Sequence, residues 1–123
     1  MNIELESSDI EIHEDLRRFV RRSIDFALST RAQHIESVLV HLSGSVAAGD
    51  FGDKSCRVQV RLNEIADVFV EARDSDLHVA IHRAVDRAGW TVARRLLRRH
   101  RNAVASMLTE LRRADQPASG RAA

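Results

Sequence analysis

Apolar and polar residues alternate in four short segments of the chain, which is the pattern of strands with one buried face. The four segments are residues 2–6, 35–44, 54–63 and 66–73. In the second of them, Val38, Val40 and Leu42 fall on one face. Because neighbouring side chains of a strand point to opposite sides, that face is expected to be buried.

Two other segments show helical spacing. Between Glu14 and about Ser29, apolar residues recur every three or four positions, which predicts an amphipathic helix. A second helical period continues without proline from Leu77 to about Arg113. Its N-cap candidates are Asp74, Ser75 and Asp76. At about 1.5 Å per residue this helix is about 55 Å long, whereas a ten-residue strand spans about 30 Å. The helix end is therefore expected to overhang the sheet.

The order of these elements, βαβββα, predicts an α+β fold. We expect a four-stranded sheet with both helices packed on one face and with a more polar opposite face, where Arg57, Gln59 and Arg61 point outward. Residues 1–113 are expected to form a single domain, because 123 residues leave little room for a second core. The small, polar residues 114–123 are expected to form a disordered tail, and the Gly/Ser/Ala/Asp-rich residues 44–53 a hairpin loop.

The apolar runs and the cysteine content of the sequence indicate the cellular location of the protein. No apolar run approaches the roughly 18–20 residues that cross a bilayer, and the N-terminus has no basic flank and no apolar block, so we expect neither a membrane span nor secretion. A single cysteine, Cys56, cannot form an internal disulfide and fits a reducing cytosol. The sequence therefore predicts a cytoplasmic protein.

The formal net charge of +1 hides a strong separation of charge. Residues 1–15 carry six acids and no Lys or Arg, whereas residues 83–113 carry nine arginines against Asp86 and Glu110. On a helical projection five arginines lie within about 60° of one another, beside an apolar stripe. These are Arg83, Arg87, Arg94, Arg98 and Arg101. Because a guanidinium can donate two parallel hydrogen bonds to a phosphate, this row predicts a face that binds RNA by phosphate spacing, with no reading of base sequence.

The rest of the sequence carries no complete catalytic, phosphate-binding or metal-binding motif. Gly44, Gly49 and Lys54 do not have the spacing of a phosphate-binding loop. His78 and His82 stand four apart, as two metal ligands on one helix face would, but no sequence feature marks a third ligand. We therefore predict no enzyme, no catalytic residue, no metal site, no cofactor and no small-molecule substrate. A metal-dependent enzyme that uses the two histidines is kept as an alternative.

Two strings carry a resemblance to a known family. HIESVLVHLS in the second strand and VEARDSDLHVAIHRAVDR at the start of the long helix resemble the ribosome hibernation promoting factor and ribosome-associated inhibitor family (sigma-54 modulation protein-like), over about residues 2–102. The matching positions at the helix start are Asp74, Asp76, Leu77, Ala80, Ile81 and Arg87. The resemblance implies binding to the small ribosomal subunit between head and body, where the protein would occupy tRNA and mRNA positions and keep ribosomes inactive.

The resemblance also assigns residues. The rRNA contacts of the family fall on Arg87 and Arg94, with Arg83 and Arg98 as extensions. We add Arg101 from the same row, and Arg21 and Arg22 from the outer face of the first helix.

The chain departs from the family pattern in three ways. His78 stands where a tyrosine is usual, Gly89 and Trp90 interrupt a stretch that is normally charged, and the sequence ends before the dimerisation domain of the long forms. We therefore expect a short form that silences single ribosomes as a monomer or weak homodimer. The alternative is a divergent relative with another RNA or protein partner, for example a dimeric regulatory protein that uses Trp90 and the overhanging helix without binding ribosomes.

Overall fold

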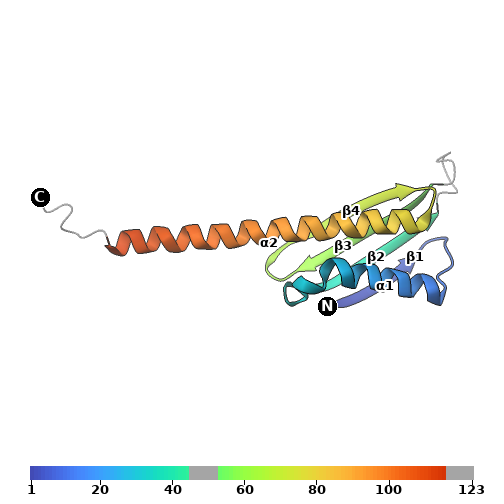
Figure 1. Ribbon diagram of the computed structural model, residues 1–123, viewed down its shortest axis with the longest axis horizontal. Coiled ribbons are helices and arrows are strands. Elements are labelled where there is room, and N and C mark those ends of the chain that lie inside the picture. The colour runs from blue at the N-terminus through green and yellow to red at the C-terminus, as the bar shows by residue number, and fades with distance from the viewer. Residues whose placement is uncertain (45–52, 116–123) are drawn as a thin grey trace, which may run out of the picture. The chain divides into compact units, whose positions relative to one another are not determined.

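The computed structural model describes residues 1–44 and 53–115 (Figure 1). Its elements are β1 (Asn2–Ser7), α1 (Glu14–Leu28), the 3-10 helix η1 (Ser29–His34), β2 (Ile35–Gly44), β3 (Lys54–Leu62), β4 (Ile65–Asp74) and α2 (Leu77–Asp115). The chain divides into two compact units. The N-terminal unit comprises residues 1–92, and the C-terminal unit begins at Ala93 and contains the second part of α2.

The sheet of the N-terminal unit has the strand order β1-β2-β3-β4. β1 runs parallel to β2, because the helix α1 carries the chain back to the starting edge between them. The other neighbours are antiparallel hairpin partners. The β3–β4 turn contains Glu64 at φ 60°, a left-handed conformation that few residues other than glycine adopt in a tight turn.

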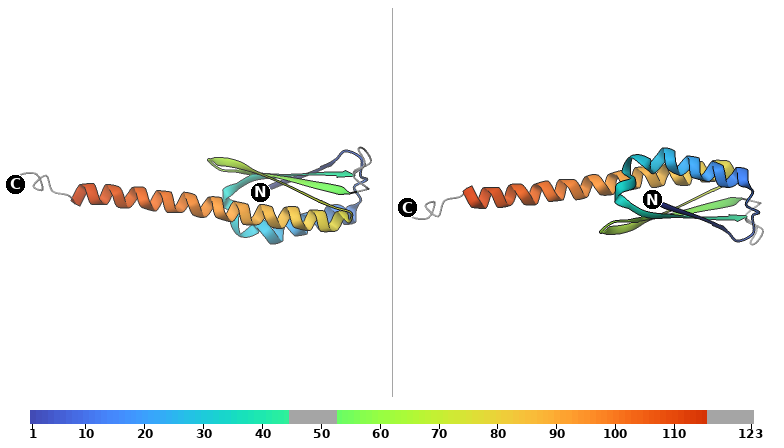
Figure 2. Two further views of the ribbon diagram at one scale, coloured as in Figure 1. Left: turned by 90° about the horizontal axis from the view of Figure 1, so that it is seen from above. Right: turned by 90° about the horizontal axis from the view of Figure 1, so that it is seen from below.

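Both helices cover the same face of the sheet in the N-terminal unit (Figure 2), which confirms the predicted α+β fold. The apolar side chains of the strands, α1 and the first part of α2 meet in one core. The members exposed by less than 2% are Val20, Ile24, Leu28, Val38, Val40, Leu42, Cys56, Val58, Val60, Val68, Ala80, Ile81, Ala84, Ala88 and Val92. The alternation in the strands and the helical period therefore both predicted which side chains are buried.

Gly89 allows the two helices to approach closely. A Cβ atom at this position would lie 3.2 Å from the carbonyl oxygen of Ala27 in α1, which is tighter than ordinary van der Waals contact. A larger side chain would have to displace one helix from the other. Gly89 therefore sets the spacing between α1 and α2.

The start of α2 is capped as its sequence predicts. The Oδ1 atom of Asp76 accepts a hydrogen bond from the backbone N–H of His78 at 2.9 Å, which satisfies one of the free donors of the first turn. Asp74 in turn accepts the N–H of Asp76 at 2.8 Å. The two aspartates therefore hold the junction between β4 and α2.

The observed boundaries differ slightly from the predicted ones. β1 and β4 are longer than predicted, and α1 is followed by η1, which the sequence analysis did not identify. β3 ends at Leu62, one residue early, because the N–H and Nδ2 of Asn63 donate to the carbonyl oxygens of His34 and Gln33 at the end of η1. The predicted disordered tail begins as helix, because α2 continues to Asp115. Residues 116–123 and 45–52, which contain most of the predicted tail and loop, lie outside the described residues.

The prediction of a single domain over residues 1–113 stays a prediction. Among the described residues, none of the helices has the length and apolar character that a membrane crossing needs.

Candidate nucleic-acid interface

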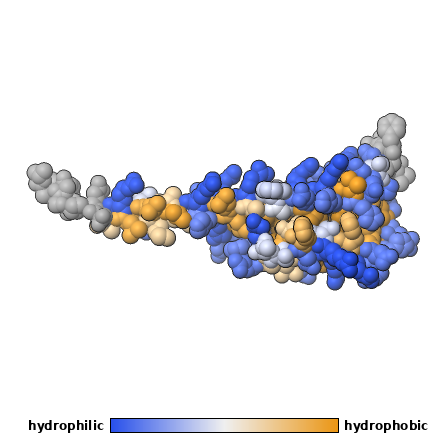
Figure 3. Space-filling view, in the orientation of Figure 1, coloured by the Kyte–Doolittle hydropathy of each residue, from blue (hydrophilic) through white to orange (hydrophobic). Residues whose placement is uncertain are grey.

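The C-terminal unit presents three of the predicted arginines to solvent. Arg94, Arg98 and Arg101 are exposed, and their spacings of four and three residues place them on one side of α2. Within the described part of the chain they form no ion pair. Figure 3 shows that hydrophilic side chains gather along one side of this part of α2 and hydrophobic ones along another.

Arg112 extends this row and was missed by the sequence analysis. It is exposed and follows Arg101 by 11 residues, which is close to three full turns of an α-helix. The three-turn spacing from Arg101 is the sequence signal that identifies it.

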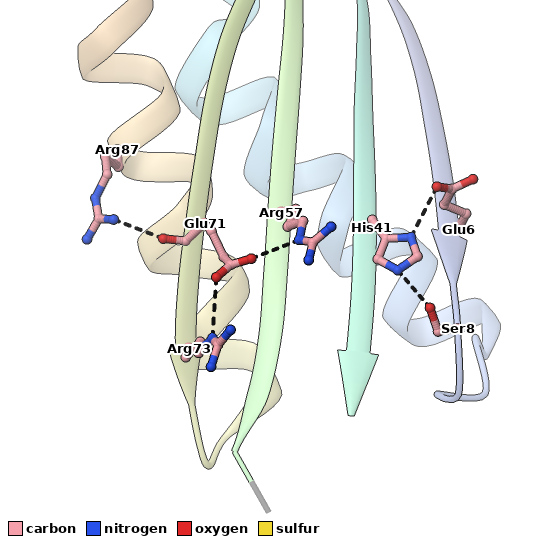
Figure 4. Close-up of polar contacts among 7 residues, drawn as sticks. All are labelled: Glu6, Ser8, His41, Arg57, Glu71, Arg73 and Arg87. Atoms are coloured by element: carbon pink, nitrogen blue, oxygen red, sulfur yellow. Dashed lines mark hydrogen bonds and ion pairs between the residues drawn. The ribbon is translucent and has the colours of Figure 1, made fainter. Parts of the chain in front are cut away.

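The N-terminal unit holds Arg83 and Arg87 against β4. The Nη1 atom of Arg87 donates a hydrogen bond to the carbonyl oxygen of Glu71 at 2.9 Å (Figure 4). The Nη1 atom of Arg83 lies 3.6 Å from Oδ1 of Asp74. These contacts with β4 hold both side chains in place. Because a guanidinium has five N–H donors, each arginine still has donors for a phosphate.

The two arginines predicted on α1 do not join this cluster. Arg21 and Arg22 are exposed, but α1 lies over β1 and β2, whereas Arg87 points toward β4 on the far side of α2 (Figures 1 and 4). The structure therefore brings Arg83 and Arg87 together and leaves Arg21 and Arg22 as a separate basic group on the helical face.

The open face of the sheet carries arginines that are matched by carboxylates. Glu71 accepts hydrogen bonds from Nε of Arg57 at 2.8 Å and from Nε of Arg73 at 3.3 Å (Figure 4). The hydrogen bond from Arg57, together with the charges of both arginines, lowers the pKa of the Glu71 carboxyl from its usual value. The Nε atom of Arg61 lies 4.0 Å from Oδ2 of Asp67. This face therefore offers little uncompensated positive charge to a polyanion.

Ser8, His41 and Glu6 form a hydrogen-bonded chain that the sequence analysis did not find. The Nε2 atom of His41 lies 2.8 Å from Oγ of Ser8, and its Nδ1 atom lies 3.1 Å from Oε1 of Glu6 (Figure 4). A serine, a histidine and a carboxylate in this order can act as a hydrolytic triad. Here the backbone N–H of Ser8 donates to the carbonyl oxygen of Leu42, so it is not free to stabilise an oxyanion. The chain of contacts joins β1 to β2.

His78 and His82, the two histidines considered as metal ligands, have different surroundings. The ring of His78 packs edge-on against Phe19, with the ring centroids 4.7 Å apart, and its Nδ1 atom lies 3.8 Å from Asp76. His82 lines a groove between α1 and α2. Within residues 1–44 and 53–115, no group of three or more His, Cys, Asp or Glu residues could hold a metal ion.

Cys56 is fully buried in β3, and burial raises the pKa of its thiol from 9.0 to about 12. We expect the folded protein to resist 5,5′-dithiobis(2-nitrobenzoic acid) at pH 8 and to react stoichiometrically in urea. Because the folded state binds the thiol proton more tightly, its contribution to stability is complete below about pH 9 and is lost as the pH rises toward 12. Rapid labelling of the native protein at pH 8 would contradict this expectation.

Comparison with known proteins identifies the family. The model for the sigma 54 modulation protein / S30EA ribosomal protein family matches residues 3–104. The chain belongs to this family. The match covers α1, the first part of α2 and all of the sheet except Asn2 of β1, and it confirms the resemblance found in the two sequence strings.

Two solved structures are similar to this S30EA family member. The N-terminal domain of Protein Y from Thermus thermophilus is 35% identical, with a TM-score of 0.62, and the alignment covers 76% of this chain and 98% of that one. A ribosomal subunit interface protein from Coxiella burnetii is 11% identical, with a TM-score of 0.67, over 79% of this chain and 99% of that one, and shows the fold alone. No curated protein sequence matches the chain. The family points to a ribosome-associated modulation or hibernation factor, which is not a class of enzyme.

Proposed function

We propose that this chain binds the small ribosomal subunit by placing the arginines of α2 against rRNA, and that it blocks tRNA and mRNA sterically. Membership of the S30EA family supports a ribosomal partner, and a ribosomal partner supports a cytoplasmic location. The protein acts in this proposal by occupying a site, without a chemical step, and needs no cofactor.

The observation that carries the proposal is the contrast between two sets of arginines. On the sheet face, Arg57 and Arg73 share the carboxylate of Glu71. In the C-terminal unit, Arg94, Arg98 and Arg101 are exposed and have no carboxylate partner among the described residues. Closely spaced positive charges without internal partners favour a polyanion, and rRNA supplies phosphates at regular spacing.

The proposal predicts a steep dependence of binding on salt. With five arginine–phosphate contacts, the logarithm of the binding constant should fall against the logarithm of salt with a slope of about −3.5 to −4.5. Affinity should drop about 100-fold or more between roughly 50 and 200 mM KCl. Co-sedimentation with purified small subunits across this range measures the slope. Binding that is indifferent to salt, or absent at low salt, would contradict the proposal.

A second candidate function is self-association, which exposed apolar side chains favour. Leu97, Met107, Leu108 and Leu111 in the C-terminal unit are 48–58% exposed, and Trp90 in the N-terminal unit is 68% exposed. Light scattering distinguishes the candidates, because a dimer that persists in high salt favours apolar pairing. A monomer that co-sediments with small subunits favours the proposed function.

A further inference from the structure

A groove of about 460 Å³ lies between α1 and α2 within the N-terminal unit. Its walls include Phe19 and Phe26 of α1 and Val85 of α2, and its polar side chains include Arg22, His82 and Asp86. Its volume is in the range of about 300–1,000 Å³ that is usual for small-ligand sites. We call it the helix groove.

The apolar wall of the helix groove is unusual for the outer surface of an amphipathic helix. Phe26 is 94% exposed, and it follows Phe19 by seven residues, so both rings lie on the same side of α1 about 10 Å apart. Val85 lines the groove but is only 2% exposed, so the two phenylalanines supply most of the accessible apolar surface. An exposed ring beside further apolar surface is suited to stacking against a flat ligand.

Three of the polar side chains that line the helix groove are free to meet a ligand, whereas the hydroxyl of Ser23 donates to the carbonyl oxygen of Phe19 at 2.9 Å. Arg22, His82 and Asp86 form no hydrogen bond or ion pair among the described residues. Arg22 lies on α1 about one turn from each phenylalanine and is the one arginine among the described residues that line the groove. The groove therefore combines aromatic walls with a single guanidinium, which can meet a base and its adjoining phosphate.

Asp86 places a carboxylate in the helix groove. It is the only acidic residue of α2 between Leu77 and Thr109, a stretch rich in arginine. A carboxylate repels phosphate, but it accepts hydrogen bonds from the N–H groups on the Watson–Crick edge of a base. Guanine offers two adjacent N–H donors on that edge, at N1 and N2, and so matches the two oxygens of a carboxylate.

We propose that the helix groove binds one unstacked nucleobase of RNA, with guanine preferred. The base stacks on Phe26, its Watson–Crick edge donates to Asp86, and the guanidinium of Arg22 contacts the adjoining phosphate. This inference rests on the proposed function, because it assumes an RNA partner. It adds a readout of base identity to a surface whose other contacts are to phosphate.

The test measures fluorescence anisotropy of labelled RNA hairpins that are identical except for one bulged nucleotide. The probes carry a bulged G, A, C or U, or no bulge. We expect the bulged-G hairpin to bind about 10-fold more tightly than the paired one and severalfold more tightly than the bulged-U hairpin, since base stacking and a charged hydrogen bond each add this much. Phe26→Ala should remove the preference for a bulge, and Asp86→Asn should remove the preference for G.

Phe69→Ala is the matched control. Phe69 is 70% exposed but lies on the open face of the sheet, outside the helix groove, so its replacement should leave every preference unchanged. Circular dichroism of each variant confirms folding, which is expected because Phe26 and Asp86 are exposed.

Three outcomes would overturn the inference. The first is equal binding, or no binding, of all hairpins by a protein that still co-sediments with small subunits, in which case the proposed function stands without the base site. The second is a bulged-G preference that survives Phe26→Ala. The third is loss of self-association in RNA-free Phe26→Ala, which would identify the groove as a protein interface. Failure to bind both hairpins and small subunits would reject the proposed function as well.

Discussion

Replacing Arg94 and Arg98 with glutamate is expected to abolish co-sedimentation with the small ribosomal subunit. Each arginine–phosphate contact contributes about 1.5–3 kcal/mol, so the loss of two weakens binding at least about 100-fold, and the new carboxylates repel phosphate in addition. Translation inhibition by the variant should fall in parallel. The fold should remain, because both side chains are exposed and form no ion pair within the described residues.

The matched control reverses the charge of Arg61 and Arg73, which changes the net charge by the same amount on the sheet face. These side chains already lie beside Asp67 and Glu71, so the control should retain most of its binding at about 100 mM salt. If Arg94→Glu/Arg98→Glu binds as well as the parent and keeps its circular dichroism, the arginine row is only a solvated face. If both double variants lose binding equally, net charge alone accounts for the effect.

Replacing Ile81 with aspartate is expected to unfold the protein. Ile81 is fully buried beneath the sheet, where an unpaired carboxylate loses its hydration and finds no compensating partner. Because a small domain is stable by only about 5–15 kcal/mol, a cost of several kcal/mol removes most of that margin. Urea titrations followed by circular dichroism should show no native baseline, or a free energy of unfolding that is lower by several kcal/mol.

The neighbouring exposed position supplies the control for this prediction. His82→Asp introduces the same residue one position along α2, at a side chain that faces solvent, and should shift the free energy of unfolding by less than about 1 kcal/mol. Equal midpoints for Ile81→Asp and His82→Asp would show that the α2 stripe is not part of the core.

Local periodicity was sufficient to predict most of the fold. The strand faces built on Val38, Val40 and Val58 and the helix faces built on Ile24 and Ile81 follow directly from spacings of two and of three to four residues. Capping of α2 by Asp76 was predictable for the same reason, because the donor and the acceptor lie two residues apart. The end of β3 was not, since it depends on the contact between Asn63 and η1.

The candidate interface was predictable only as a set of positions. Helical spacing placed Arg94, Arg98 and Arg101 on one side of α2, and the structure leaves all three exposed. Helical spacing did not indicate that Arg87 would donate to the carbonyl oxygen of Glu71, or that Arg22 would line a groove together with residues of α2. Both neighbourhoods are formed by elements that are far away in sequence.

The sequence by itself determined which side chains are buried, where the four strands and two α-helices form and where positive charge is concentrated, because these depend on neighbours within one or two turns. Only the tertiary structure decided which charged side chains pair with one another. The parallel register of β1 and β2 brings Glu6 to His41 across 35 residues, and β3 and β4 bring Arg57 to Glu71. The helix groove likewise lies between α1 and α2, which approach each other closely at Gly89 and Ala27, a contact between segments that no spacing along the chain encodes.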